Sequence, residues 1–187
     1  MIKVLLISVL FNILAVQGKR LLAHFSVPSS TTAVSKPVGL YWNEDLSISG
    51  LATEKPWLGN GDAEHLISVL LPGAEASESL NPGSTFTLRS ADFSSRVRVT
   101  FDLNAEEENN EEGTLPYTIK IVNLAMTDRA GAHPLELKHG DGGYIWIEPS
   151  EFVLHMTDVE HTFELNDPNH VPFVSVKIIG VDEDREL

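Results

Sequence analysis

The stretch Arg20-Leu21-Leu22-Ala23-His24-Phe25-Ser26-Val27 decides how the fold of this chain is interpreted. In an extended conformation its apolar side chains share one face, and only Leu22 breaks the alternation with polar residues. The stretch therefore predicts a half-buried β-strand, whose inward side chains are Leu21, Ala23, Phe25 and Val27. Two interpretations of this strand stay open. It is either an ordinary first strand of its own sheet, or a detachable strand that completes the sheet of another molecule.

The residues around this strand define the expected domain organisation. Lys3 precedes a mostly apolar run over residues 4–16, and Gly18 ends it, as in a secretory signal peptide. We therefore expect residues 1–18 to be removed on export. The polar residues after Pro28 make 19–32 a strand with a hinge, and 33–187 is expected to be one β-sandwich domain with an acidic C-terminal tail. The apolar run is shorter than the about 20 residues that span a bilayer, so we expect no integral membrane segment.

Charge and cysteine usage exclude several classes of protein. The chain carries 27 Asp and Glu against 13 Lys and Arg, a formal net charge of −14. Such a surface repels nucleic acid, so a nucleic-acid partner is not expected. Cysteine is absent, and an exported protein of this kind must rely on its hydrophobic core rather than on disulfides.

Short alternating segments between turn signals recur along the rest of the chain. Residues 97–103 alternate strictly, and with 117–121 they predict a hairpin whose tip, residues 105–113, is acidic. The continuous apolar run 66–71 predicts a central strand buried on both faces. Residues 74–83 are expected to be a polar connection, and Val174, Val176 and Ile178 share one face of the last strand. No segment shows a helical period, so the sequence predicts an all-β sandwich.

Four histidines are the main candidates for chemistry in this sequence. His133, His139, His155 and His161 lie in one region, but their spacing matches neither His-Glu-x-x-His nor a compact zinc ligand set. We expect His139 and His155 each to stand alone on a strand edge or turn. The chain has no nucleophile elbow, no cysteine nucleophile and no phosphate-binding glycine loop. The sequence therefore predicts a protein that is not an enzyme and has neither a metal site nor a cofactor.

Taken together, these features resemble the chaperone–usher pilin subunits, in particular the cysteine-free kind that forms thin fimbriae and surface capsules. The resemblance rests on the leader, on the alternating strand with its Ser/Thr-rich break, and on the strongly alternating last strand. Local similarity runs through Ala33-Val34-Ser35-Lys36-Pro37-Val38-Gly39-Leu40-Tyr41-Trp42, Leu46-Ser47-Ile48, the 97–121 hairpin and residues 173–179.

The resemblance implies an incomplete immunoglobulin-like sandwich that is completed by donor-strand addition. Residues 19–27 would be the donor, with Leu21, Ala23, Phe25 and Val27 as plugs, and Val174, Val176 and Ile178 would line the acceptor groove. The implied partners are other copies of the chain, a periplasmic chaperone, an outer-membrane usher and a host receptor for adhesion. The implied location is the cell surface, reached through the periplasm.

A self-contained secreted β-sandwich that binds a carbohydrate or protein ligand is the alternative. It would use exposed aromatic side chains such as Trp57, Tyr144 and Trp146, although core packing is the expected role of Trp146.

Overall fold

The structure, a computed structural model, describes residues 19–29, 36–45, 62–92, 95–103, 117–125, 132–139 and 143–182. Every regular element within these ranges is a β-strand, as the sequence predicts, and none of the described residues forms a helix able to cross a membrane. The strands are β1 (Lys19–Ser26), β2 (Val38–Asp45), β3 (Asp62–Leu70), β4 (Glu75–Ser79), β5 (Ser84–Ser90), β6 (Arg96–Leu103), β7 (Tyr117–Asn123), β8 (Leu135–His139), β9 (Gly143–Ile147), β10 (Phe152–Thr157), β11 (Thr162–Asn166) and β12 (Pro172–Asp182).

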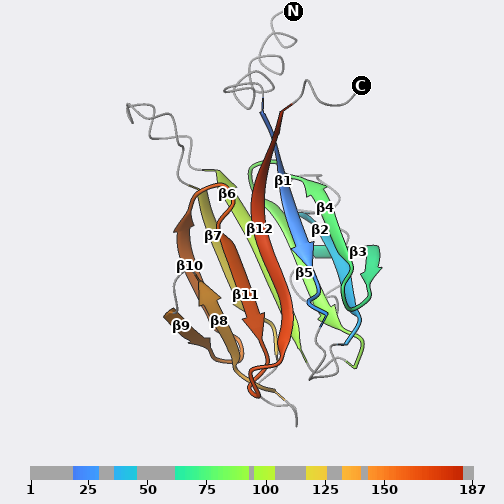
Figure 1. Cartoon of the computed structure of the whole chain (residues 1–187), viewed down its shortest axis with the longest axis vertical. Helices are drawn as coiled ribbons and strands as arrows, with labels where there is room; N and C mark the ends of the chain where they lie inside the picture. The colour runs from blue at the N-terminus through green and yellow to red at the C-terminus, as the bar shows by residue number, and fades with distance from the viewer. Residues whose placement is uncertain are drawn as a thin grey trace, which may run out of the picture.

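The strands form two antiparallel sheets, which Figure 1 shows as two layers facing each other. One sheet has the order β4-β1-β12-β11-β8-β9, and the other has the order β10-β7-β6-β5-β2-β3. The consecutive strands β3 and β4 lie at edges of different sheets, and so do β9 and β10. The chain therefore crosses between the layers at both sides of the sandwich.

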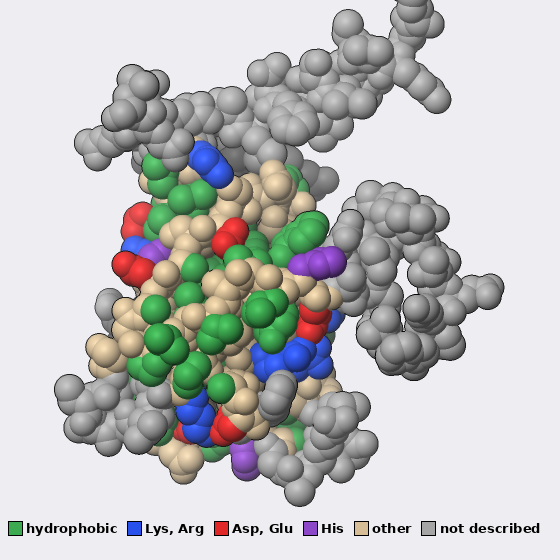
Figure 2. Space-filling view, turned by 90° about the vertical axis from the view of Figure 1, so that its right-hand side faces the viewer, with side chains coloured by type: hydrophobic (Ala, Val, Ile, Leu, Met, Phe, Trp, Pro, Cys, Tyr) green, Lys and Arg blue, Asp and Glu red, His purple; other side chains and the backbone are tan. Residues whose placement is uncertain are grey.

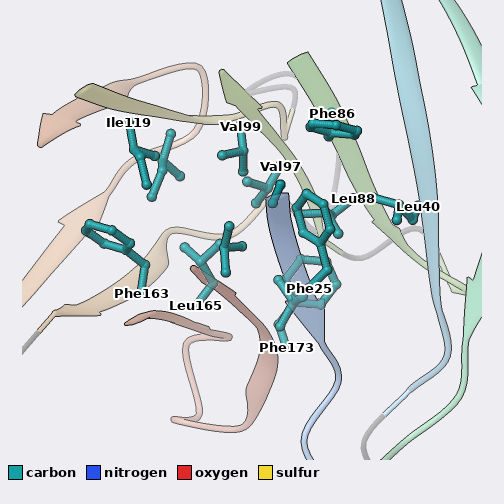
Figure 3. Packing of buried hydrophobic residues seen from close by; sticks show 14 of the residues in the cluster. Phe25, Leu40, Phe86, Leu88, Val97, Val99, Ile119, Phe163, Leu165 and Phe173 are labelled. Carbon is teal, nitrogen blue, oxygen red and sulfur yellow. The ribbon is translucent and has the colours of Figure 1, made fainter. Parts of the chain in front are cut away.

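The core lies between the sheets and is built by the inward face of each alternating strand. Phe25 of β1 packs edge-on against Phe86 of β5 at 5.1 Å between ring centroids, and Phe86 packs against Phe101 of β6 at 6.0 Å. Figure 3 shows side chains of both sheets meeting in this core, where Phe163 and Leu165 of β11 face Val99 of β6 and Ile119 of β7. A cysteine-free chain obtains its stability from such a continuous apolar cluster.

The hairpin predicted from residues 97–103 and 117–121 is confirmed. β6 and β7 pair antiparallel, and Val99 lies opposite Ile121. Val97, Val99 and Phe101 are fully buried, whereas Arg98 and Thr100 between them are partly exposed. The shared inward face of Val174, Val176 and Ile178 is confirmed in the same way.

The prediction of a central strand at residues 66–71 is wrong. β3 pairs only with β2 and forms an edge of its sheet, and Leu66, Val69 and Leu71 are more than half exposed. Figure 2 shows hydrophobic side chains gathered on the side of the molecule where β3 and β4 lie. At an edge only the inward face meets the core, so Leu70 is the one large apolar side chain of this run that is buried.

Two strands were not anticipated from the sequence. Residues 74–83, expected to be a connection, contain β4, which pairs with β1 although its sequence is polar. β8 is buried on both faces near its start, with Leu135, Glu136 and Leu137 all inaccessible. Several predicted features lie outside the described residues: the leader, most of the hinge, the segment 46–48, Trp57, the acidic tip and the charged tail after Asp182.

Candidate functional site

The N-terminal strand β1 lies inside its own sheet, between β12 and β4. Eight of its residues pair antiparallel with β12, and five pair with β4. The pairing with β4 extends beyond the strand ends, because Val27 donates to the carbonyl of Ala74 at 3.0 Å and Leu80 donates to the carbonyl of Leu21 at 3.0 Å. Figure 1 shows β1 in blue between β12 in red and β4 in green. In this structure the strand therefore completes the chain's own sandwich.

The structure brings together the two residue sets that the resemblance implied. Ala23 pairs with Ile178, and Phe25 pairs with Val176, so the predicted plugs lie on the predicted acceptor strand. Ala23, Phe25 and Val27 are buried, and Leu21 is partly buried against the same cluster. Val174 lies beside this pairing and is opposite Leu165 of β11.

The outward side of β1 is held by polar contacts. Arg20 donates to Ser79, and Nδ1 of His24 lies 2.9 Å from the hydroxyl of Ser77. The hydroxyl of Ser26 lies 2.6 Å from the hydroxyl of Ser175 on β12. These contacts follow from the alternation, since the polar positions of β1 meet the polar positions of its two neighbours.

Two aromatic side chains form an exposed platform on the edge strand β9. Tyr144 and Trp146 alternate with Ile145 and Ile147, so they share the outer face of the strand, where they are 58% and 46% exposed. The expectation that Trp146 packs in the core is wrong, because the core positions of β9 are the isoleucines. We call Tyr144 and Trp146 the aromatic platform.

Polar groups surround the aromatic platform on the neighbouring strands. Lys138 of β8 lies opposite Tyr144 and donates to Glu164 of β11 at 3.1 Å, a hydrogen bond that raises the pKa of Lys138. Beside Trp146, the exposed His170 ring lies 6.1 Å from the indole between ring centroids. An ammonium and an imidazole therefore lie beside two flat aromatic rings, and the ammonium is paired with a carboxylate.

A buried carboxylate fixes the imidazole of this group. Glu136 is 1% exposed, and its two oxygens contact the Asn166 amide at 3.2 Å and Nδ1 of His170. The backbone of His170 is in the left-handed region, with φ 59°, inside a turn where the carboxylate of Asp167 accepts from the amides of Asn169 and Val171 at 2.8 and 2.9 Å. The turn and the carboxylate together hold the ring beside Trp146. No local sequence pattern predicts that His170 lies near Glu136 and Trp146, because His170 is far from both in the sequence.

An open hollow of about 660 Å³ lies on the outer face of the other sheet. Trp42, Arg98 and Lys120 contribute to its lining, together with residues of the β4–β5 turn. It offers a single exposed aromatic ring, whereas the platform offers two on one strand.

The expectation that His139 and His155 each stand alone is wrong. Together with His161 they form a cluster in which one nitrogen of each ring lies within 4.8 Å of the others. His133 is exposed and is not among these three.

Comparison with models of protein families, with curated proteins and with solved structures found no match to this chain.

Proposed function

We propose that this chain is an exported, self-contained β-sandwich module that binds carbohydrate through the aromatic platform of β9. The observation that supports it is the exposure of Tyr144 and Trp146 on one strand face, beside Lys138 and His170. Sugar rings present flat apolar faces ringed by hydroxyls, and they are bound by stacking on aromatic rings with hydrogen bonds from flanking polar groups. The proposed role is binding, with no catalytic step.

The local geometry supports this role in a second way. An aromatic side chain that is half exposed loses favourable burial, and two on one edge strand form an apolar surface that a ligand can cover. The side chain of His170, held by Glu136, loses little conformational freedom when a ligand hydroxyl binds it, because the ring is already positioned.

Binding to soluble polysaccharides, measured by retardation in affinity gels and by tryptophan fluorescence titration, tests this proposal. Trp146→Ala and Tyr144→Ala are expected to weaken binding at least tenfold without lowering the melting temperature. Phe152→Ala, which removes an exposed aromatic ring from β10, is the matched control and should bind as the unmodified chain does. Loss of binding in Trp42→Ala alone would place the ligand in the hollow instead, and no binding to a broad glycan panel would overturn the proposal.

A second candidate is a structural subunit of a bacterial surface fimbria or capsule-like polymer. Here the sandwich would be of the immunoglobulin-like type and incomplete by itself, and β1 would insert into a neighbouring copy, after a chaperone and an usher had guided assembly. The observation that favours it is the seat of β1. It is the first described strand and lies between β12 and β4, so its removal would leave unpaired edges on both neighbours that a strand from another copy could fill.

A circular permutant distinguishes the two candidates. Lys19 lies opposite Asp182, so residues 19–29 moved behind Asp182 through a two-residue Asn-Gly turn would form a hairpin with β12 in the observed register. Exchange of β1 between copies predicts heat- and detergent-resistant polymers of the unmodified chain and a monomeric permutant, as measured by light scattering after size exclusion. An unmodified chain that stays monomeric at all concentrations would dismiss the polymer and leave the binding module.

A further inference from the structure

Three histidines from separate parts of the sequence meet where the two sheets face each other. His139 ends β8 in one sheet, His155 lies on β10 at the edge of the other, and His161 directly precedes β11. The rings of His139 and His155 are 4.6 Å apart between centroids, and those of His155 and His161 are 5.9 Å apart. One ligand nitrogen from each lies within 4.8 Å of the other two. We call these residues the histidine cluster.

The cluster rests on the edge of the core. The ring of buried Phe163 contacts His155 at 5.2 Å and His161 at 4.8 Å between centroids. Gly143 faces the ring of His139, where a Cβ would come within 3.4 Å of Nε2. The glycine therefore leaves room at this nitrogen, and the phenylalanine supports the other two rings.

The turn before His161 is anchored to the neighbouring strand β12. Glu160 has a left-handed φ of 72°, its amide donates to the carbonyl of Ile178 at 2.7 Å, and its carboxylate accepts from Lys177 at 3.0 Å. A non-glycine residue occupies this region at an energetic cost, which the surrounding contacts must offset. The turn is thus fixed in the conformation that directs His161 toward the other two histidines.

The ring nitrogens of the histidine cluster can donate lone pairs to a metal ion. Nε2 of His161 is buried and has no hydrogen-bond partner among the described residues, an arrangement that costs free energy unless a ligand satisfies it. Burial and the neighbouring imidazoles of His139 and His161 lower the pKa of His155. A neutral imidazole is the form that binds a metal ion.

We propose that His139, His155 and His161 bind one divalent transition-metal ion of the zinc class, with the fourth position open to water or an external ligand. Imidazole nitrogens suit zinc, copper and nickel, whereas magnesium and calcium prefer oxygen. Nitrogens bonded to zinc at about 2.0–2.1 Å lie about 3.4 Å from one another in a tetrahedron. Because the three ligand nitrogens are now up to 4.8 Å apart, metal binding would bring them closer together by rotation about the histidine side-chain bonds. The ion would link β8 and β11 of one sheet to β10 of the other.

Equilibrium dialysis of the tag-free chain against Zn²⁺ tests the proposal. We expect one Zn²⁺ per chain, a higher melting temperature with Zn²⁺ that EDTA reverses, and no effect of Mg²⁺. His139→Gln, His155→Gln and His161→Gln should each weaken Zn²⁺ binding at least tenfold. His133→Gln, which changes an exposed histidine outside the cluster, should leave the affinity and the melting shift unchanged.

Co²⁺ provides a measurement that does not depend on the folding of any variant. Bound to the unmodified chain, it should give the strong visible absorption of a four-coordinate site, and equimolar Zn²⁺ should remove this absorption. Zn²⁺ binding that survives all three glutamine substitutions, an equal loss in His133→Gln, or a Co²⁺ spectrum identical to that of the free ion would each overturn the metal site.

Discussion

The strands β1 and β3 are both rich in apolar residues, yet one lies in the middle of a sheet and the other at an edge. β1 alternates, and its inward residues Ala23 and Phe25 are completely buried. β3 has the more continuous apolar run, and Leu66 and Val69 are more than half exposed. Alternation, rather than total apolarity, therefore indicated which strand contributes a packed face, because alternation reflects the difference between the two sides of a sheet.

The largest expected difference between the strands comes from a buried charge. Phe25→Asp places an unpaired carboxylate in the core, at a cost of several kcal/mol against a total stability of about 5–15 kcal/mol, so the chain should not fold. Leu66→Asp should change the free energy of unfolding by about 0.5 kcal/mol or less. Circular dichroism melts compare the two, with Val99→Asp on β6 as a second buried site. A folded Phe25→Asp variant would mean that β1 is dispensable for the sandwich.

A smaller difference is expected within β3 itself. Leu70 is 4% exposed and Leu66 is 57% exposed. Leu70→Ala should therefore lose about 2–5 kcal/mol of unfolding free energy, and Leu66→Ala about 0.5 kcal/mol or less. Urea titrations measure both. Equal losses would indicate that the outer face of β3 is covered, so that β3 would not differ from β1 in its burial.

The stability of the edge strand β3 also depends on pH through an ion network centred on Glu64. Glu64 is paired with Arg89 and Arg96. Burial raises the pKa of Glu64, but the hydrogen bond and charge of Arg96, with the charge of Arg89, outweigh it and lower that pKa below 4.5. The network's contribution to stability is therefore complete above about pH 4.5 and is lost as the pH falls through the lowered pKa. Urea titrations between pH 7 and pH 3 should show this loss in the unmodified chain and a flatter dependence in Glu64→Gln. An unchanged dependence would assign the acid sensitivity to other carboxylates.

The smallest effect on stability should come from a charge on the exposed face of β3. Val69→Lys is expected to leave the melting temperature within about 2 °C of the unmodified chain, because this side chain points outward. The same change should reduce self-association at high concentration, since a lysine on an edge strand discourages pairing with another edge. Light scattering as a function of concentration measures this second effect. Identical scattering by the variant and the unmodified chain would show that the β3 edge does not mediate self-association.

How far the sequence predicted the structure depended on whether the information was local. The β6–β7 hairpin and the inward face of β12 follow from alternation within one segment. β4 has a polar sequence and becomes a strand only because β1 offers it an edge to pair with. Glu136 can be buried on β8 because Asn166 and His170, 30 and 34 residues away, contact its carboxylate.

The two candidate sites also differ in whether local sequence could predict them. Tyr144 and Trp146 were visible as an alternating aromatic pair, although their exposure depended on the position of β9 at an edge. The histidine cluster has no spacing signature, because its members come from two sheets and are brought together by the packing of β10 against β8 and β11.

The pairing of β1 with β12 also affects the order of folding. Ser26 and Ser175, which contact each other, are 149 residues apart. β1 and β12 cannot pair until β12 has left the ribosome, and contacts so distant in sequence make folding slow. During that time the apolar face of β1 has no partner on β12. Chains truncated before β12 should consequently aggregate rather than fold.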